Sequence, residues 1–251
     1  MITLYSGTPG SGKSFHAAKD VYKRFEIGGG LIANFPVKRP EGLKPKKELR
    51  VSYWDNSEIT PQRLTQYALT YHEMGKEGQT LLIVDEAQVV WNSREFQSKG
   101  RQDWIAFFSQ HRKLGYNILL IAQNDRMLDR QIRFVIENEV RHRKLDNYGF
   151  GGKLVKTITG NRTWFIAIEY WYGGNKLKLN SEVFPYRKKF ADIYDSYRMF
   201  DDLDGKNVLL AGDPAGSAPA LRLDTVKPAR KRYKTFKKSS PPDESAAPAA
   251  P

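Results

Sequence analysis

Eight consecutive residues near the N-terminus constrain the fold of this chain more than any other feature: Gly7, Thr8, Pro9, Gly10, Ser11, Gly12, Lys13 and Ser14. They match the pattern G-x-x-x-x-G-K-[ST] at every required position. An apolar run, Ile2–Ser6, precedes them, and residues 13–25 follow with apolar side chains at helical spacing. A strand, a glycine-rich loop and a helix in this order form a phosphate-binding unit, so the context argues against a chance glycine-rich turn.

The chemistry of phosphate binding gives individual positions in this loop a role. The backbone N–H groups are expected to point inward around the phosphates, while Lys13 reaches the β- and γ-phosphates and Ser14 offers its hydroxyl to Mg²⁺. The helix that begins here directs the positive end of its dipole at the anion. The loop therefore predicts a site for a nucleotide and Mg²⁺.

Two acidic residues, Asp85 and Glu86, directly follow the apolar run Leu81–Val84. Successive residues at a strand end point in different directions, so Asp85 is expected to hold Mg²⁺ while Glu86 polarises the attacking water. Alternatively, the two acids are only the solvated end of a strand, but the nearby phosphate loop argues against that interpretation. The pair favours hydrolysis over transfer to a small substrate.

ATP is favoured over GTP because the chain has no Asn-Lys-x-Asp motif.

Gln123 ends the apolar run Ile118–Ala122. If that strand lies beside the strand ending at Asp85, the Gln123 amide is placed to contact the γ-phosphate or the attacking water. A polar residue that merely terminates a strand explains the same position equally well.

The fold class follows from alternating patterns along the first half of the chain. Expected strands cover residues 2–6, 31–35, 49–54, 80–84 and 117–122, and expected helices cover residues 13–25, 61–74 and 103–114. This alternation predicts an α/β fold with a mainly parallel sheet and helices on both faces. From about residue 134 the expected strands 135–144, 154–159 and 163–171 suggest an antiparallel extension of the sheet.

Composition divides the 251 residues into a folded part and a tail. We expect a domain over residues 1–200, a linker over 201–225 and a basic, Pro/Ala-rich disordered tail over 226–251. The formal net charge of +13 indicates an anionic partner, and the absence of Cys excludes disulfides, thiolate metal sites and Cys nucleophiles. Seven Lys and Arg residues within 227–238 suit reversible contact with an anionic membrane or with DNA, although a merely solubilising tail has the same composition.

Several of these segments together resemble the zonula-occludens-toxin-like family, the gene I assembly ATPases of filamentous phages. The resemblance covers roughly residues 1–200. Its segments are Met1–Ser6 running into Gly7–Ser14, then Leu82–Ala87, His111–Gly115 leading into Ile118–Gln123, and Tyr194–Tyr197. The phosphate loop is common to many NTPases, whereas the succession His-Arg-x-x-Gly, strand, Gln is more discriminating.

The resemblance implies a RecA-like P-loop NTPase of the additional-strand class that assembles and exports virions, with Gln123 as a sensor. It also implies a homo-oligomeric ring that acts on phage coat proteins or on a complex of phage single-stranded DNA. Ring ATPases often insert an arginine from a neighbouring subunit. The candidates are Arg112, Arg126, Arg130 and Arg133, of which we prefer Arg112 and Arg133, although each is also explained as an ordinary surface arginine.

Family members commonly continue into a transmembrane helix, whereas this sequence has no apolar run near the ~18 residues needed. We therefore expect the chain in the host cytoplasm, with possible peripheral contact at the inner membrane. Alternatives to the assembly motor are a nucleotide-gated binding protein and a cytoplasmic DNA-packaging ATPase. A two-lobed helicase is disfavoured because too few residues remain for a second RecA-like domain, and a small-molecule kinase because of the adjacent acids.

Overall fold

The computed structural model describes residues 1–92, 100–145, 162–173 and 176–194, and all structural statements concern these residues. Its strands are β1 (Ile2–Ser6), β2 (Gly29–Ala33), β3 (Leu49–Tyr53), β4 (Thr80–Val84), β5 (Tyr116–Ile121), β6 (Asn138–Lys144), β7 (Trp164–Trp171) and β8 (Lys178–Pro185). Its helices are α1 (Lys13–Ile27), α2 (Pro61–Tyr71), α3 (Ala87–Val90), α4 (Arg101–Gln110), α5 (Arg130–Val135), α7 (Lys188–Ala191) and the 3₁₀ turn η1 (Asp125–Met127).

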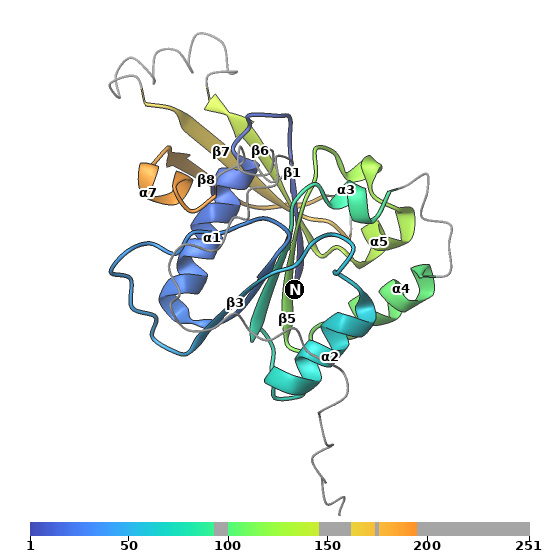
Figure 1. Cartoon of the computed structure of the whole chain (residues 1–251). Helices are drawn as coiled ribbons and strands as arrows, with labels where there is room; N and C mark the ends of the chain where they lie inside the picture. The colour runs from blue at the N-terminus through green and yellow to red at the C-terminus, as the bar shows by residue number, and fades with distance from the viewer. Residues whose placement is uncertain (93–99, 146–161, 174–175, 195–251) are drawn as a thin grey trace, which may run out of the picture. The chain divides into compact units, whose positions relative to one another are not determined.

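The described strands form one sheet in the order β3-β2-β4-β5-β1-β6-β7-β8 (Figure 1). Every pair from β3 to β6 is parallel, whereas β7 and β8 are antiparallel to their neighbours. Strand β5 therefore lies between β1, which leads into the phosphate loop, and β4, which leads into Asp85. The carboxyl ends of these strands meet at one edge of the sheet, and the loop and the acids share that edge.

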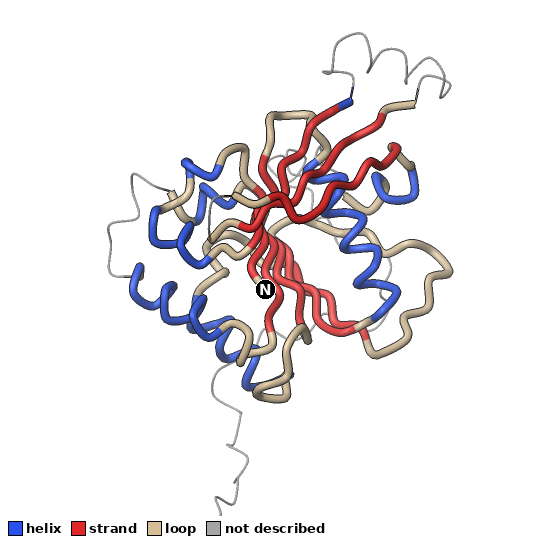
Figure 2. Tube along the Cα trace, turned by 180° about the vertical axis from the view of Figure 1, so that it is seen from behind, coloured by secondary structure: helices blue, strands red, loops and turns tan. Residues whose placement is uncertain are grey.

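Helices cover both faces of the sheet, and each face has its own hydrophobic core (Figure 2). Helix α1 packs Ala17, Val21 and Phe25 onto one face, where α7 also lies. Helices α2 to α5 cover the other face, on which Trp91 is fully buried. The parallel strands are thus apolar on both sides, as their continuous hydrophobic runs predict.

The fold class is confirmed: the chain is a RecA-like α/β structure with a mainly parallel sheet and antiparallel strands toward the C-terminus. The sequence pattern predicts that the antiparallel extension begins with the expected strand 135–144, and this prediction is wrong. Strand β6 pairs in parallel with β1, so only β7 and β8 form the antiparallel extension. The preceding residues cross back over the sheet through α5, which includes Val135, and this crossover returns β6 to the direction of β1.

Other differences from the sequence pattern concern element ends. Strand β2 begins at Gly29 rather than at residue 31, because Gly29 and Gly30 already pair with Leu49 and Arg50 of β3. The expected strand 154–159, the linker 201–225 and the tail 226–251 lie outside the described residues. Among the residues that are described, no helix has the length and apolar character needed to cross a membrane.

Candidate nucleotide site

The phosphate loop joins β1 to α1 with three glycines in the left-handed region of backbone space. Gly7, Gly10 and Gly12 have φ angles of 145°, 71° and 97°. Two of these glycines are also crowded: a Cβ on Gly12 would lie 2.5 Å from the ring of Phe165, and one on Gly7 would lie 2.5 Å from the carbonyl oxygen of His142. Only glycine satisfies both conditions, so the conformation that turns N–H groups inward depends on these positions.

Lys13 is the buried cation of the loop and is only 9% exposed. Its ammonium donates to the carbonyl oxygens of Gly7 at 2.8 Å and Thr8 at 3.3 Å, so the side chain lies over the loop. Burial lowers the pKa of Lys13, and the charges of Asp85 and Glu86 oppose that effect. The nearby carboxylates therefore help to keep a cation where phosphate oxygens would bind.

Asp85 is held in place by side chains from three other parts of the chain. The Asn34 amide bonds both backbone groups of Asp85, accepting from its N–H at 2.7 Å and donating to its carbonyl oxygen at 2.8 Å. The Asp85 carboxylate accepts hydrogen bonds from the Tyr194 hydroxyl and, at 3.5 Å, from the Ser14 hydroxyl. Burial and the Asp85 charge raise the pKa of Tyr194, which keeps its hydroxyl protonated as a donor.

Glu86 directly follows Asp85 in the chain, and its side chain is exposed. Its backbone N–H donates to Asp85 Oδ1 at 2.8 Å, and its side chain accepts from Gln88. Its φ angle of 48° is uncommon for a residue other than glycine, because Cβ crowds the backbone there. This conformation lies at the turn from β4 into α3, where the Asp85 side chain is buried and the Glu86 side chain is exposed. The separate roles of the two acids stay a prediction.

Mg²⁺ prefers hard oxygen ligands and usually keeps several waters and phosphate oxygens in its shell. Ser14 and Asp85 provide such oxygens beside the loop. The described residues contain no group of three or more His, Cys, Asp or Glu residues that could hold a metal alone. The donor set therefore fits a metal that is bound mainly through nucleotide phosphates, with Ser14 and Asp85 as the protein ligands.

Gln123 lies next to the phosphate loop, as the sequence pattern requires. Strand β5 pairs with β4, which fulfils the condition stated for its role, and the Gln123 carbonyl oxygen accepts from the Gly7 N–H at 3.2 Å. The Gln123 side chain is exposed. The backbone contact fixes the residue at the loop while leaving its amide available for a ligand, and the sensor role stays a prediction.

The two arginine candidates lie in different places. Arg112 is at the opposite edge of the sheet from the phosphate loop, where it forms an ion pair with Glu137 beside the chain's N-terminus. Arg133 lies in α5, and its Nε atom is buried without a hydrogen-bond partner among the described residues. Neither side chain is bonded to the loop or to Asp85 of its own subunit, so both remain candidates for action on a neighbour only.

Two residues of the site were not anticipated from the sequence pattern. Asn34 follows the buried strand β2, and a polar residue at the carboxyl end of a parallel strand was the available signal. In the sequence, Tyr194 stands out only as part of the segment Tyr194–Tyr197 that contributes to the family resemblance. Its main chain bridges to Val37, which brings its hydroxyl to Asp85 across 109 positions of sequence. No local pattern could reveal that contact.

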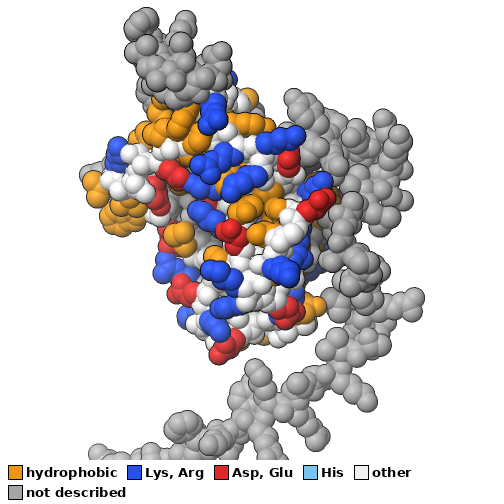
Figure 3. Space-filling view, turned by 90° about the vertical axis from the view of Figure 1, so that its left-hand side faces the viewer, with side chains coloured by type: hydrophobic (Ala, Val, Ile, Leu, Met, Phe, Trp, Pro, Cys, Tyr) orange, Lys and Arg blue, Asp and Glu red, His pale blue; other side chains and the backbone are white. Residues whose placement is uncertain are grey.

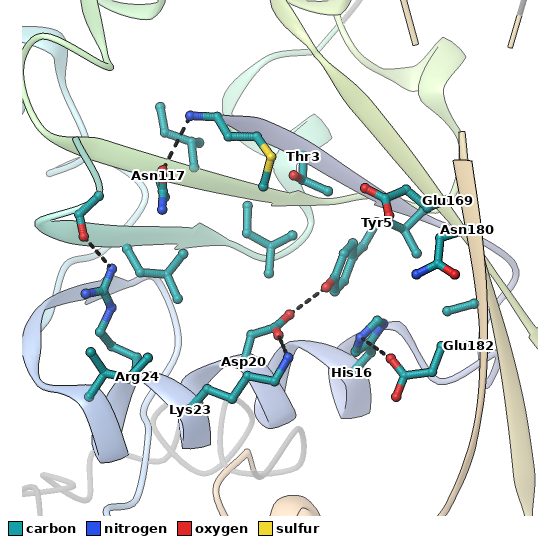
Figure 4. Close-up of a pocket in the computed structure, with 18 of the residues that line it drawn as sticks. Thr3, Tyr5, His16, Asp20, Lys23, Arg24, Asn117, Glu169, Asn180 and Glu182 are labelled. Atoms are coloured by element: carbon teal, nitrogen blue, oxygen red, sulfur yellow. Dashed lines mark hydrogen bonds and ion pairs between the residues drawn. The ribbon is translucent and has the colours of Figure 1, made fainter. Parts of the chain in front are cut away.

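A separate cavity of about 510 Å³ lies between α1 and the strands, extending toward the sheet edge that bears the N-terminus (Figure 4). Its polar groups are paired with one another: the Tyr5 hydroxyl donates to Asp20 at 2.5 Å, and His16 lies 3.8 Å from Glu182. Behind it, His16 Nδ1 lies 2.9 Å from His142 Nε2, which ties α1 to β6. Burial lowers the pKa of both histidines, to about 3 for His142.

The position of β5 between the loop-bearing strand and the acid-bearing strand gives the class of the protein, a RecA-like P-loop NTPase fold of the additional-strand type. The family model for the zonular occludens toxin (Zot) matches residues 1–192, and the chain belongs to this family.

Curated relatives are the Gene 1 proteins of filamentous phages. The protein from Enterobacteria phage f1 is 32% identical over 213 residues, covering 79% of this chain and 60% of the relative. The protein from Salmonella phage IKe is 28% identical over 207 residues, covering 78% of this chain and 55% of the relative. The chain thus spans a little more than half the length of these relatives.

Two solved structures are also similar. The N-terminal domain of zonular occludens toxin from Neisseria meningitidis has 18% identity and a TM-score of 0.47, covering 77% of this chain and 98% of that one. B204, the DNA-packaging ATPase from Sulfolobus Turreted Icosahedral Virus, has 15% identity and a TM-score of 0.45, covering 74% of this chain and 98% of that one. The fold class itself follows from the strand order.

Proposed function

We propose that the protein is an ATP hydrolase that drives assembly and export of a filamentous or related virion, coupling ATP hydrolysis to movement of DNA or of a nucleoprotein. The observation that carries the proposal is the convergence of Lys13, Ser14 and Asp85 at one sheet edge, with Glu86 turned outward. Membership of the Zot family and the Gene 1 relatives support the assembly role.

Each residue of the site has a part in this hydrolysis. Lys13 would move from the loop carbonyls to the β- and γ-phosphates, where its charge stabilises the transferred group. Mg²⁺, when bound, would neutralise phosphate charge, with Ser14 and Asp85 as its ligands. Glu86 would orient the attacking water and accept its proton, and Gln123 would contact the γ-phosphate or that water.

The remaining parts of the proposal concern partners and place. The active form is a homo-oligomeric ring in the host cytoplasm or at the cytoplasmic face of the inner membrane. Its cargo is a phage coat protein or the complex of phage single-stranded DNA. The basic segment 227–238 would supply a peripheral, salt-sensitive contact with anionic lipid.

The test compares Lys13→Ala and Glu86→Gln with the wild-type chain in ATP binding, ATP hydrolysis and virion assembly. Lys13→Ala should abolish hydrolysis, and turnover at the wild-type rate would refute the assigned site. Glu86→Gln should keep ATP binding while losing turnover by two or more orders of magnitude, because an amide cannot take the proton of water. Lys46→Gln is a matched control for the loss of an exposed charge away from the site and should behave as wild type.

The same Glu86→Gln variant separates the motor from a nucleotide-gated binding protein, in which ATP occupancy alone switches partner contacts. Loss of assembly with ATP binding intact supports the motor. Normal assembly without turnover would favour the gated binding protein instead.

A further inference from the structure

A second cavity, of about 700 Å³, opens directly beside the start of the phosphate loop. Residues 6–8, between β1 and the loop, form one side, and residues 123–126, after β5, form another. The third side is β6, which contributes Glu139, Arg141 and Arg143 from alternate positions, hence from one face of the strand. Any change in the loop or at Gln123 during a nucleotide cycle would alter two walls of this cavity.

Two arginines of this cavity form no ion pair with any residue that the structure describes. Its two carboxylates, Asp125 and Glu139, are both bonded to Lys176, at 3.2 Å and 3.1 Å, and Glu139 also accepts from Arg141 at 3.1 Å. By contrast, Arg126 and Arg143 are exposed, and neither forms an ion pair within the described part of the chain. The cavity thus offers two guanidinium groups that are unpaired within the described ranges, and its two carboxylates are already bonded to Lys176 and Arg141.

Aromatic rings lie against the other two cations of the cavity, Arg141 and Lys176. Arg141 lies over the ring of Tyr170 at 5.1 Å, and Lys176 lies over the ring of Tyr172 at the same distance. The Tyr172 hydroxyl donates to Asp125 at 3.1 Å, which fixes the ring beside the cavity. Arginines with aromatic rings nearby are typical of sites for single-stranded nucleic acid. Neither ring belongs to the lining of this cavity, so its arginines carry the argument through contacts with phosphate.

We propose that this cavity, defined by Arg126, Arg141, Arg143 and Lys176, binds the phosphate backbone of single-stranded DNA. The proposal rests on the assembly function above and names the surface that contacts the nucleic acid cargo. Arg126 and Arg143 form the direct phosphate contacts. Lys176 and Arg141 pair with Asp125 and Glu139, so these carboxylates do not compete with DNA phosphates for Arg126 and Arg143.

A concave, net basic cavity suits a nucleic acid strand better than a lipid surface does. On the face drawn in Figure 3, by contrast, Lys and Arg side chains stand among Asp and Glu, so the charge there is mixed. Lipid headgroups lie in a broad plane and would meet such an exposed face, whereas a single strand can enter a recess beside the phosphate loop.

The first experiment measures how the full-length chain binds a fluorescent 30-nucleotide oligothymidylate at several NaCl concentrations. The variant carries Arg126→Gln and Arg143→Gln together. Each lost phosphate contact reduces the slope of log affinity against log salt by about 0.7, so the expected loss of slope is about 1.4. The same two contacts predict binding about 25-fold weaker at 0.1 M NaCl.

The matched control removes two exposed charges elsewhere, with Lys46→Gln and Lys47→Gln in the β2–β3 loop. Lys46 lies near the C-terminal end of α1, where its N–H bonds the Glu26 carbonyl oxygen, far from the phosphate loop. This control should change affinity less than twofold. An unchanged slope in the arginine variant, or an equal loss in the control, would overturn the proposal. Equal losses for anionic vesicles and for DNA in the arginine variant would assign the cavity to lipid and would also overturn it.

A cross-linking experiment is independent of affinity, and it is simple because the chain contains no cysteine. Arg143→Cys and, separately, Lys46→Cys are labelled with a photoactivatable azidophenacyl group and mixed with the oligothymidylate. The label at position 143 should cross-link to DNA, while the label at position 46 should not. DNA binding by Lys13→Ala should be retained, so a failed cavity is distinguished from a failed ATPase. Absence of a cross-link at position 143 despite tight DNA binding would refute the site.

Discussion

The orientation of Asp85 depends on one amide side chain. Asn34, at the end of β2, closes a two-bond clamp on the backbone of Asp85, and its own amide is held by Asn56 at 2.7 Å. Both residues of the clamp are buried, so water cannot replace these bonds. Asn34 acts on the acid through the backbone of Asp85, which makes it a positioning residue.

We predict that Asn34→Ala lowers the free energy of unfolding by about 2–3 kcal/mol, because two buried backbone groups of Asp85 lose their partners. The same change should lower the rate of ATP hydrolysis, since the backbone that carries Asp85 and Glu86 is released. Chemical denaturation and steady-state turnover measure the two effects. Asn56→Ala keeps the clamp and should cost less than half as much stability, so equal losses in the two variants would argue against it.

At the scale of elements, strands β6 and β7 do more than extend the sheet. Strand β7 places the Phe165 ring against Gly12, and β6 places a carbonyl oxygen against Gly7, so both strands restrict the phosphate loop from outside. Strand β6 also lines the basic cavity and carries His142, which contacts α1. The loop is therefore held by strands that follow it by more than 120 positions in sequence.

The His16–His142 contact between α1 and β6 predicts a dependence of stability on pH. The pKa of His142 is lowered from 6.5 to about 3 by burial, so the folded chain stays unprotonated there while the unfolded chain takes up a proton below pH 6.5. The unfolding free energy should therefore fall as pH decreases through this window, by up to about 1.4 kcal/mol per pH unit for this group.

Urea denaturation between pH 4 and pH 7 measures this slope in the wild type and in His142→Gln. Two other histidines with lowered pKa values, His72 and His111, remain in both proteins, so the difference in slope reports on His142 and its partner. A flatter slope is expected in the variant, whatever its absolute stability. Identical slopes would show that the pair does not take up protons on unfolding.

The sequence pattern predicted the elements whose side chains repeat regularly, and it failed where long-range pairing decides. Strand β1 and helix α1 begin where expected because apolar periodicity and the loop motif define them. The direction of β6 depends on the crossover through α5, and the role of Tyr194 depends on a contact between distant segments. Neither leaves a periodic signal along the chain.

At the scale of the whole molecule, the ring that we propose makes the assignment of a trans-acting arginine testable. Arg133 has a buried Nε atom without a partner among the described residues, whereas Arg112 is already paired with Glu137. An arginine that completes a neighbour's site must be free to change partners. We therefore favour Arg133 over Arg112 for this role.

We predict that Lys13→Ala and Arg133→Ala subunits, each inactive alone, regain ATP hydrolysis when mixed. In an equal mixture, an intact site meets an intact arginine at about a quarter of the interfaces, so about a quarter of wild-type turnover is expected. The same mixture made with Arg112→Ala in place of Arg133→Ala should gain nothing over the unmixed Arg112→Ala subunits. No recovery with Arg133→Ala would exclude Arg133 as the trans-acting group.

The contact between Tyr194 and Asp85 has a mechanical consequence. The main chain beside Tyr194 is fastened to the loop after β2 by the Lys38 N–H, which bonds the Ile193 carbonyl oxygen at 3.0 Å, and the Tyr194 hydroxyl ends on the Asp85 carboxylate. A force on the segment that ends at Tyr194 would act on these bonds and on the packing of the buried Ile193 side chain. A shift of Tyr194 would thus be transmitted through its hydroxyl to Asp85, the acid that we propose holds the metal.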